Sequence, residues 1–221
     1  MATHAILGVD GLGPCGDAVA IRELADGIVV VAVVDVAGHG RSLAMLSAHV
    51  STGLIAMLSF GIDLTEAMMA ADRGFRSERG PDGPEFASAF AALVEPQTRR
   101  LRYVSAGHEP AMLLAIDGTP RRLETNGSVL GTLDAPSFPQ NVAYFAEGDR
   151  LVVVSDGVTE SRDSAGHMFG DAGVRQVLSG WGCARGGAPA VIRAAAAHSR
   201  DGLRDDACAL IVQLCAPADA A

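Results

Sequence analysis

Four aspartates share one local setting in this chain, because each lies where a predicted strand begins or ends. They are Asp17, Asp35, Asp156 and Asp205. A carboxylate at the end of a buried strand is costly in free energy unless a positive group lies beside it. The chain contains no lysine, and no arginine is adjacent to Asp35 or Asp156 in the sequence. A divalent cation is therefore the simplest partner for these side chains.

The chemistry of these aspartates indicates which metal they would hold. Oxygen ligands without His or Cys at zinc-binding spacing favour Mg2+ or Mn2+ over Zn2+. Two such ions that share one carboxylate would form a two-metal hydrolytic centre. Each aspartate taken alone also fits a turn or a cap, because Asp and Gly dominate turns for local reasons. From spacing alone, the metal-site interpretation and the turn-or-cap interpretation both stay open.

Hydrophobic spacing predicts the elements that must position these aspartates. Apolar and β-branched runs predict strands, and apolar residues at helical intervals predict helices. Thr65 is a candidate N-cap for the second helix. The expected strands are 3–9, 18–24, 28–36, 86–94, 101–105, 111–116, 121–125, 142–145, 150–154 and 208–214, and the expected helices are 41–58, a segment from about 64, a segment around 174–178, and 189–198.

The order of these elements favours an α+β fold. The helices are grouped instead of alternating with the strands, which indicates largely antiparallel sheets flanked by helices. No linker and no internal repeat divides the sequence. We therefore expect a single domain over residues 1–221.

The composition limits the classes of function. Of the 221 residues, 49% are hydrophobic, and the formal net charge is -9. A negative chain argues against nucleic-acid binding, which needs a basic face. The longest apolar run, 28–34, is too short to span a membrane, and the first residues do not resemble a signal peptide. We therefore expect a cytoplasmic protein with no nucleic-acid and no membrane partner, whose four cysteines are reduced.

Several other residues are weaker candidates for a site. Residues 11–16 match G-x-G-x-x-G, but a strand is expected to follow instead of a helix, so the match does not predict a dinucleotide site. His108 is expected to support a hairpin by hydrogen bonding, and His39 to line the loop after Asp35. Cys15 is expected to be a small buried residue, with a redox-sensitive thiol as the alternative.

Five segments resemble, in order, the motifs of one enzyme family. Residues 34–40 (V-D-V-A-G-H-G) resemble its D-x-x-G-H-G element, and residues 101–110 resemble its L-x-Y-x-x-A-G-H-x-P hairpin. Residues 155–160 (S-D-G-V-T-E), the F-G pair at 169–170 and the D-D pair at 205–206 resemble its later motifs. The family is the bacterial PPM, or protein phosphatase 2C-like, serine/threonine phosphatases, in the branch of SpoIIE, RsbU and RsbX. The layout is closest to the stand-alone RsbX type.

The resemblance implies a fold and a metal site. The fold is the four-layer α/β/β/α sandwich of the PPM phosphatases, with two Mn2+ or Mg2+ ions at one edge of the paired sheets. Asp35 would bridge the two ions, and the carbonyl of Val36 would be a further ligand. Asp156 and Asp205 would complete one metal site, and Asp17 would serve the other, directly or through water. Asp35, Asp156 and Asp205 would then be the catalytic residues.

The resemblance also implies a reaction and a substrate. The reaction is hydrolysis of phosphoserine or phosphothreonine by direct attack of a water that bridges the metals. The substrate is a phosphorylated STAS-domain protein, an anti-sigma-factor antagonist or related scaffold in a partner-switching stress response. The chain lacks the second aspartate that many relatives have after Asp17, and Asp206 is expected to orient the neighbouring loop. Two alternatives stay open: a pseudophosphatase that docks a phosphoprotein without turnover, and a phosphatase of small phosphomonoesters.

Overall fold

The computed structural model describes residues 15–38, 41–80, 83–180, 186–200 and 202–213, together with the backbone of residues 2–7. These residues form two five-stranded sheets in which every strand pairs antiparallel with its neighbours. The two-sheet α+β architecture predicted from the sequence is thereby confirmed.

Each sheet combines strands that lie far apart in the sequence. The first sheet, called sheet A here, has the order β1-β10-β9-β6-β7, and sheet B has the order β2-β3-β4-β5-β8. The strands of sheet A are β1 (Ala2–Leu7), β10 (Ala207–Gln213), β9 (Arg150–Val154), β6 (Met112–Leu114) and β7 (Pro120–Arg122). The strands of sheet B are β2 (Asp17–Glu23), β3 (Val29–Val36), β4 (Ala87–Glu95), β5 (Arg100–Ala106) and β8 (Asn141–Tyr144).

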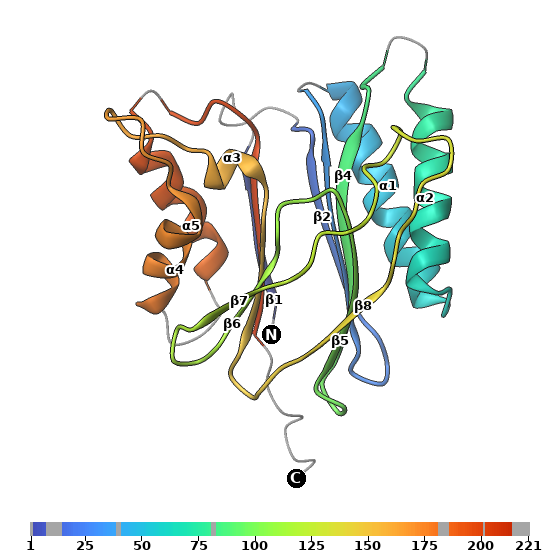
Figure 1. Cartoon of the computed structure of the whole chain (residues 1–221), viewed down its shortest axis with the longest axis horizontal. Helices are drawn as coiled ribbons and strands as arrows, with labels where there is room; N and C mark the ends of the chain where they lie inside the picture. The colour runs from blue at the N-terminus through green and yellow to red at the C-terminus, as the bar shows by residue number, and fades with distance from the viewer. Residues whose placement is uncertain are drawn as a thin grey trace.

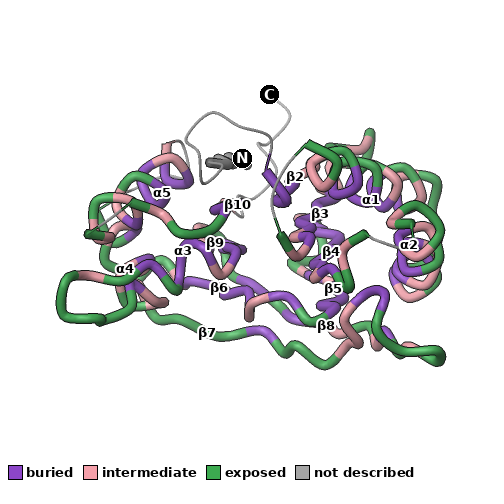
Figure 2. The backbone as a smooth tube through the Cα atoms, turned by 90° about the horizontal axis from the view of Figure 1, so that it is seen from above, coloured by how far each residue is buried: buried purple, intermediate pink, exposed green. Residues whose placement is uncertain are grey.

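Five helices complete the described part of the chain. They are α1 (Arg41–Ser59), α2 (Leu64–Glu78), α3 (Asp156–Thr159), α4 (Gly170–Ser179) and α5 (Gly187–His198). Helices α1 and α2 cover the outer face of sheet B, and α4 and α5 cover the outer face of sheet A (Figure 1). The view from above shows the buried residues concentrated between these layers (Figure 2). The result is the four-layer α/β/β/α sandwich.

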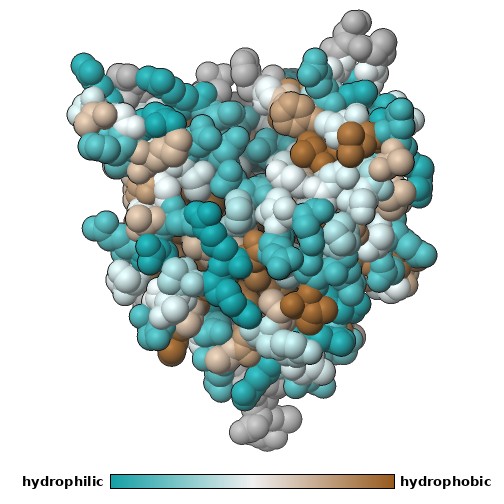
Figure 3. All heavy atoms as spheres, in the orientation of Figure 1, coloured by the Kyte–Doolittle hydropathy of each residue, from teal (hydrophilic) through white to brown (hydrophobic). Residues whose placement is uncertain are grey.

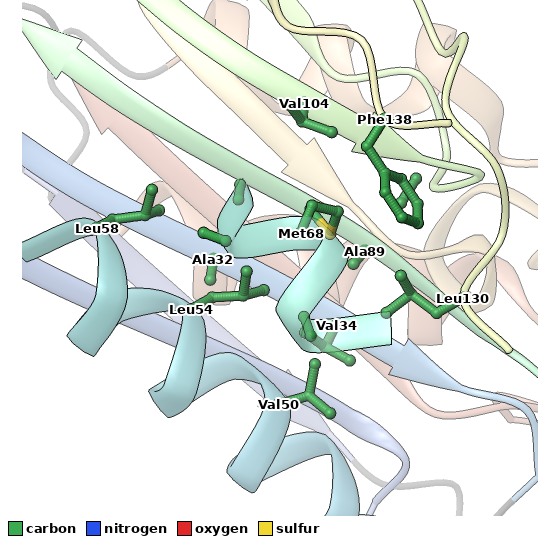
Figure 4. Close-up of a cluster of buried hydrophobic side chains, with 14 of the residues drawn as sticks. Ala32, Val34, Val50, Leu54, Leu58, Met68, Ala89, Val104, Leu130 and Phe138 are labelled. Carbon is green, nitrogen blue, oxygen red and sulfur yellow. The ribbon is translucent and has the colours of Figure 1, made fainter. Parts of the chain in front are cut away.

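Three hydrophobic clusters hold the four layers together, and β3 contributes to two of them. Val30, Ala32 and Val34 pack toward α1 and α2, whereas Val31 and Val33 pack toward sheet A. This alternation follows from the two-residue period of a strand, and it explains why the whole run is apolar. Figure 4 shows the first cluster, in which Val34 of β3 lies near Val50 and Leu54 of α1. The third cluster joins sheet A to α4 and α5.

The molecular surface is mostly hydrophilic on the face drawn in Figure 3, where hydrophobic residues form a few small groups. Helix α1 is long and apolar enough to cross a membrane by length and composition alone. Its side chains Leu46, Val50, Leu54 and Leu58 are buried in the cluster between α1, α2 and sheet B. Because this side of α1 forms part of the core, its apolar character has a structural explanation.

The structure corrects three details of the sequence analysis. The N-cap of α2 is Asp63, whose side chain accepts a hydrogen bond from the backbone N–H of Thr65; Thr65 itself is not the cap. Strands β6 and β7 are three residues each, shorter than the predicted segments. Asp156 does not stand in a simple turn, because it begins the one-turn helix α3. A single turn leaves no periodicity in the sequence by which it could be predicted.

Candidate metal centre

Two of the predicted aspartates face each other in sheet B. Asp17 begins β2 and pairs in register with Asp35 near the end of β3. Asp35 pairs in turn with Ser88 of β4. Asp17 is buried, and Asp35 is partly exposed. Residues opposite each other in an antiparallel ladder have Cβ atoms about 4.5–5.5 Å apart, so the register places two carboxyl groups side by side.

The other two aspartates come from sheet A. Asp156 is the first residue of α3, directly after β9, and Asp205 lies just before β10. The backbones of these two segments are in close contact: a Cβ added at Gly157 would lie 1.9 Å from the carbonyl oxygen of Asp206. Only glycine permits this approach. Gly157 therefore lets the Asp156 helix and the Asp205 loop converge at one end of sheet A.

Two long-range hydrogen bonds join the two sheets at this end. The Ser155 hydroxyl donates to Oδ2 of Asp17 over 2.7 Å, and it accepts from the backbone N–H of Cys208 over 2.9 Å. The backbone N–H of Gly16 donates to Oδ2 of the buried Asp206 over 2.6 Å. Asp206 thus orients the loop before β2. The sequence analysis expected Asp206 to orient a neighbouring loop.

Gly16 also brings its own loop close to Val36, the residue expected to offer its carbonyl. The N–H of Val36 donates to the carbonyl of Gly16 over 3.1 Å. A Cβ added at Gly16 would lie 2.6 Å from the carbonyl oxygen of Val36 and 2.9 Å from that of Gly38. A side chain at position 16 would therefore force either its own loop or the Val36 carbonyl to move.

The carboxyl groups are close enough to perturb one another strongly. Burial, followed by the charges of Asp156 and Asp205, raises the pKa of Asp35 to about 7. Burial and the charge of Asp35 raise the pKa of Asp17 well above its usual range. Burial and the charge of Asp205 raise the pKa of Asp156. All four aspartates therefore belong to one cluster of negative charge.

Within the described residues, the ion pairs of arginine and histidine involve other carboxylates. In the described part of the chain, no arginine or histidine forms an ion pair with any of the four aspartates. Several carboxylates that are partly buried and repel one another fit a site for hard divalent cations.

The side chains alone do not complete a metal site. Among the residues that the structure describes, no group of three or more His, Cys, Asp or Glu side chains is arranged to hold a metal ion. The remaining ligands would be the carbonyl of Val36 and water. Mg2+ commonly keeps several waters when it binds to one or two carboxylates, so the donors present fit such an ion.

The weaker candidates have structural roles in the described residues. His108 is buried, its Nδ1 lies 2.8 Å from the Ser88 hydroxyl, and burial lowers the pKa of its imidazole to about 4. The thiol of Cys15 donates to the Asp17 carbonyl over 3.3 Å, and burial and the Asp17 charge raise its pKa to about 12. A thiol that remains protonated is a poor nucleophile. His39 and residues 11–14 of the G-x-G-x-x-G match lie outside the described residues.

Two features of the site were not assigned from the sequence. Ser155 has a defined role as the link between Asp17 and sheet A, and its place directly before Asp156 in S-D-G-V-T-E was the available signal. A hollow of about 220 Å³ adjoins Asp156 and Asp205 and includes Arg162 and Arg204 in its lining. Nothing in the sequence pattern connects these two arginines, which lie 42 positions apart.

Comparisons with known proteins agree with this geometry. The family model described as "Stage II sporulation protein E (SpoIIE)" matches residues 25–214. Phosphoserine phosphatase RsbU of Bacillus subtilis is 30% identical over 139 residues, which are 62% of this chain and 41% of that protein. The PP2C phosphatase domain of SpoIIE from Bacillus subtilis superposes with a TM-score of 0.83 at 17% identity, over 98% of this chain and 64% of that chain.

RsbX in complex with magnesium superposes with a TM-score of 0.70 at 15% identity, over 95% of this chain and 92% of that chain. The chain spans less than half the length of the curated relatives that it matches. At these identities, the solved structures establish the fold.

Proposed function

The chain belongs to the SpoIIE family of PP2C-like phosphatase domains, and from that premise we propose that it is a metal-dependent phosphatase of phosphoserine or phosphothreonine in proteins. One observation carries this proposal: Asp17 and Asp35 lie in register in sheet B, and the Asp156 helix and the Asp205 loop approach them from sheet A. The phosphoserine phosphatase activity named for RsbU supports the choice of substrate.

Each aspartate has a part in the proposed centre. Asp35 would be shared between two ions, and the charges of Asp156 and Asp205 that act on it support this role. Asp156 and Asp205 would serve one ion and Asp17 the other, with the Val36 carbonyl as a further ligand and water completing the coordination. When bound, two divalent cations supply an activated water and neutralise charge on the phosphoryl oxygens. The similarity to RsbX, solved with magnesium, supports a hard divalent cation.

Residues around the aspartates would hold the proposed ligands in position. Ser155 donates to one oxygen of Asp17, which restrains the orientation of that carboxyl group. Gly16 leaves room for the Val36 carbonyl. Because Gly157 has no side chain, α3 can contact the backbone of Asp205 and Asp206 directly. Such preorganisation matters because small displacements of catalytic groups reduce rates strongly.

We also propose that the substrate is a phosphorylated STAS-domain regulator of a partner-switching pathway. The match to the SpoIIE family model over residues 25–214 and the similarity to RsbU support this assignment.

Phosphate release from a phosphoserine peptide tests the proposed activity. We expect release in the presence of Mn2+, none after addition of EDTA, and a loss of at least a hundredfold in Asp156→Asn. The exposed Asp134→Asn is the matched control, and it should retain the wild-type rate. Mn2+-independent release, or full activity in Asp156→Asn, would contradict the proposal.

Metal counting separates an enzyme from the docking alternative. Calorimetric titration of the wild-type protein with Mn2+ should show two sites, one of which is lost in Asp156→Asn. A protein that binds at most one ion, and that binds a phosphopeptide without releasing phosphate, would favour the pseudophosphatase.

A further inference from the structure

Helices α1 and α2 form a groove on the outside of the molecule. Helix α2 lies at the outer end of the layered structure, with α1 packed beside it (Figures 1 and 2). The groove has a volume of about 560 Å³. Among the described residues, none of the four aspartates of the candidate centre lines it. The groove is therefore a feature of the surface that the proposed catalytic function does not explain.

The groove is apolar in its middle and continues into exposed hydrophobic residues. Met57 of α1 and Met69 of α2 line it and stay partly exposed. At one end Ile62 is 42% exposed, and Phe60, directly after α1, is 86% exposed. Hydrophobic residues that gather on a surface mark places where another molecule docks. The groove is thus a candidate for a protein–protein contact.

Two charged residues flank the apolar middle of the groove. Among the described residues that line it, Glu66 and Arg73 are the only charged ones. Both are exposed, and neither forms an ion pair within the described part of the chain. They lie seven positions apart on α2, about 10 Å along one face of the helix, with Met69 and Ala70 midway between them. The order along this face is acidic, apolar, basic.

Such a stripe is complementary to itself when two copies run in opposite directions. A two-fold axis between Met69 and Ala70 would set Glu66 of each copy opposite Arg73 of the other, so that both ion pairs form at once. The small side chain of Ala70 would let the two helices approach closely. A parallel arrangement would instead set Glu66 against Glu66. The charge pattern therefore favours a second copy of this chain in the antiparallel arrangement.

We propose that the α2 stripe, defined as Glu66, Met69, Ala70 and Arg73, is the interface of a homodimer with antiparallel α2 helices. Met57 and Ile62, which line the same groove, would extend the apolar contact on either side of the axis. The proposal goes beyond the proposed phosphatase function and does not depend on it, because its test measures molecular mass.

Sedimentation of the full chain tests the dimer. Between about 1 and 100 µM protein, the measured mass should rise from near 22.7 kDa, the mass of one chain, towards twice that value. In Glu66→Arg, and equally in Arg73→Glu, like charges would meet at both symmetry-related pairs. We expect each variant to raise the Kd of the dimer by at least about tenfold.

Mixing the two variants gives the sharper test. In a heterodimer of Glu66→Arg with Arg73→Glu, every contact again joins opposite charges, so the equimolar mixture should dimerise as the wild type does. The double variant in one chain should also form a homodimer. Because the mixture contains the same two polypeptides that fail to dimerise alone, recovery cannot arise from a change in helix stability.

The control and the contrary results are equally specific. Glu147→Arg makes the same change at an exposed residue between β8 and β9, outside the groove, and should leave the dimer unchanged. A wild type that stays monomeric at 100 µM would overturn the second-copy assignment and would leave the groove to a different partner. Dimerisation of either single variant at the wild-type Kd, or a mixture that stays monomeric, would overturn the antiparallel α2 interface.

Discussion

Ser155, the residue directly after β9 of sheet A, donates a 2.7 Å hydrogen bond to Asp17 of sheet B. The two residues are 138 positions apart in the sequence, and their contact joins the two sheets at the candidate metal centre. The same hydroxyl accepts a hydrogen bond from the N–H of Cys208. One buried side chain after β9 therefore bonds to both β2 and β10. The position of Asp17 therefore depends on the packing of the two sheets.

Replacing Ser155 with alanine should weaken both the fold and the centre. The variant leaves the buried N–H of Cys208 without its acceptor and removes the donor to Asp17, which should cost about 1–3 kcal/mol of unfolding free energy. Urea denaturation measures this loss, and calorimetry should show weaker Mn2+ binding. Ser155→Thr keeps the hydroxyl and should restore most of both properties. Equal behaviour of the alanine and threonine variants would show that the hydroxyl has no such role.

Removing the charge of Asp35 should stabilise the metal-free protein. At pH 8 Asp35 is repelled by Asp156 and Asp205, and an amide of the same shape relieves this repulsion. We expect the Tm of Asp35→Asn in EDTA to exceed that of the wild type by about 2–4 °C, the shift that roughly 1 kcal/mol produces in a domain of this size. With Mn2+ the order should reverse. A lower Tm in EDTA, relative to the Asp134→Asn control, would contradict the repulsion.

The metal-free protein should lose stability as the pH rises from about 4 to about 7. The pKa of Asp35 is about 7 in the folded protein, against an ordinary value of 3.8, and the pKa values of Asp17 and Asp156 are also raised. Between these limits the folded state binds more protons than the unfolded state, so the free energy of unfolding decreases with pH. Urea unfolding in EDTA at pH 5, 6 and 7 measures the slope. A constant or rising stability, after subtraction of the Asp35→Asn profile, would contradict the raised pKa.

Adding one methyl group at Gly16 should damage the centre. The new Cβ would lie 2.6 Å from the Val36 carbonyl oxygen, so the loop or β3 must move. We expect Gly16→Ala to lose about 1–3 kcal/mol of stability and to bind Mn2+ more weakly. In the control Gly53→Ala, the new Cβ within α1 meets nothing within 4 Å, and it should stabilise the protein by up to about 1 kcal/mol. Unchanged Mn2+ affinity in Gly16→Ala would contradict the expected damage to the centre.

Local sequence patterns predicted the elements with strong periodicity. The run that forms β3 is β-branched and buried on both faces, so its assignment was unambiguous. Helix α3 was missed because a one-turn helix has no period, and its position depends on the contact between Gly157 and the Asp206 carbonyl. Short strands such as β6 and β7 end where pairing ends, which depends on the neighbouring strand and not on the residues themselves.

The sequence predicted which residues form the candidate site, but it did not predict how they are arranged in space. Each aspartate stood at a strand end, and the order of motifs linked them to one family. The register of Asp17 with Asp35, the Ser155 hydrogen bond and the hollow lined by Arg162 and Arg204 arise from the packing of two sheets. Such long-range juxtapositions leave no periodic signal in a single sequence.

The most direct test of the central claim is Mn2+-dependent hydrolysis of p-nitrophenyl phosphate by the wild type and by Asp35→Asn. If the four aspartates form a two-metal hydrolytic centre, the wild type releases p-nitrophenol only with Mn2+, and Asp35→Asn loses at least about a hundredfold in kcat/KM while remaining folded. Equal turnover in both proteins, or turnover that persists in EDTA, would contradict the claim.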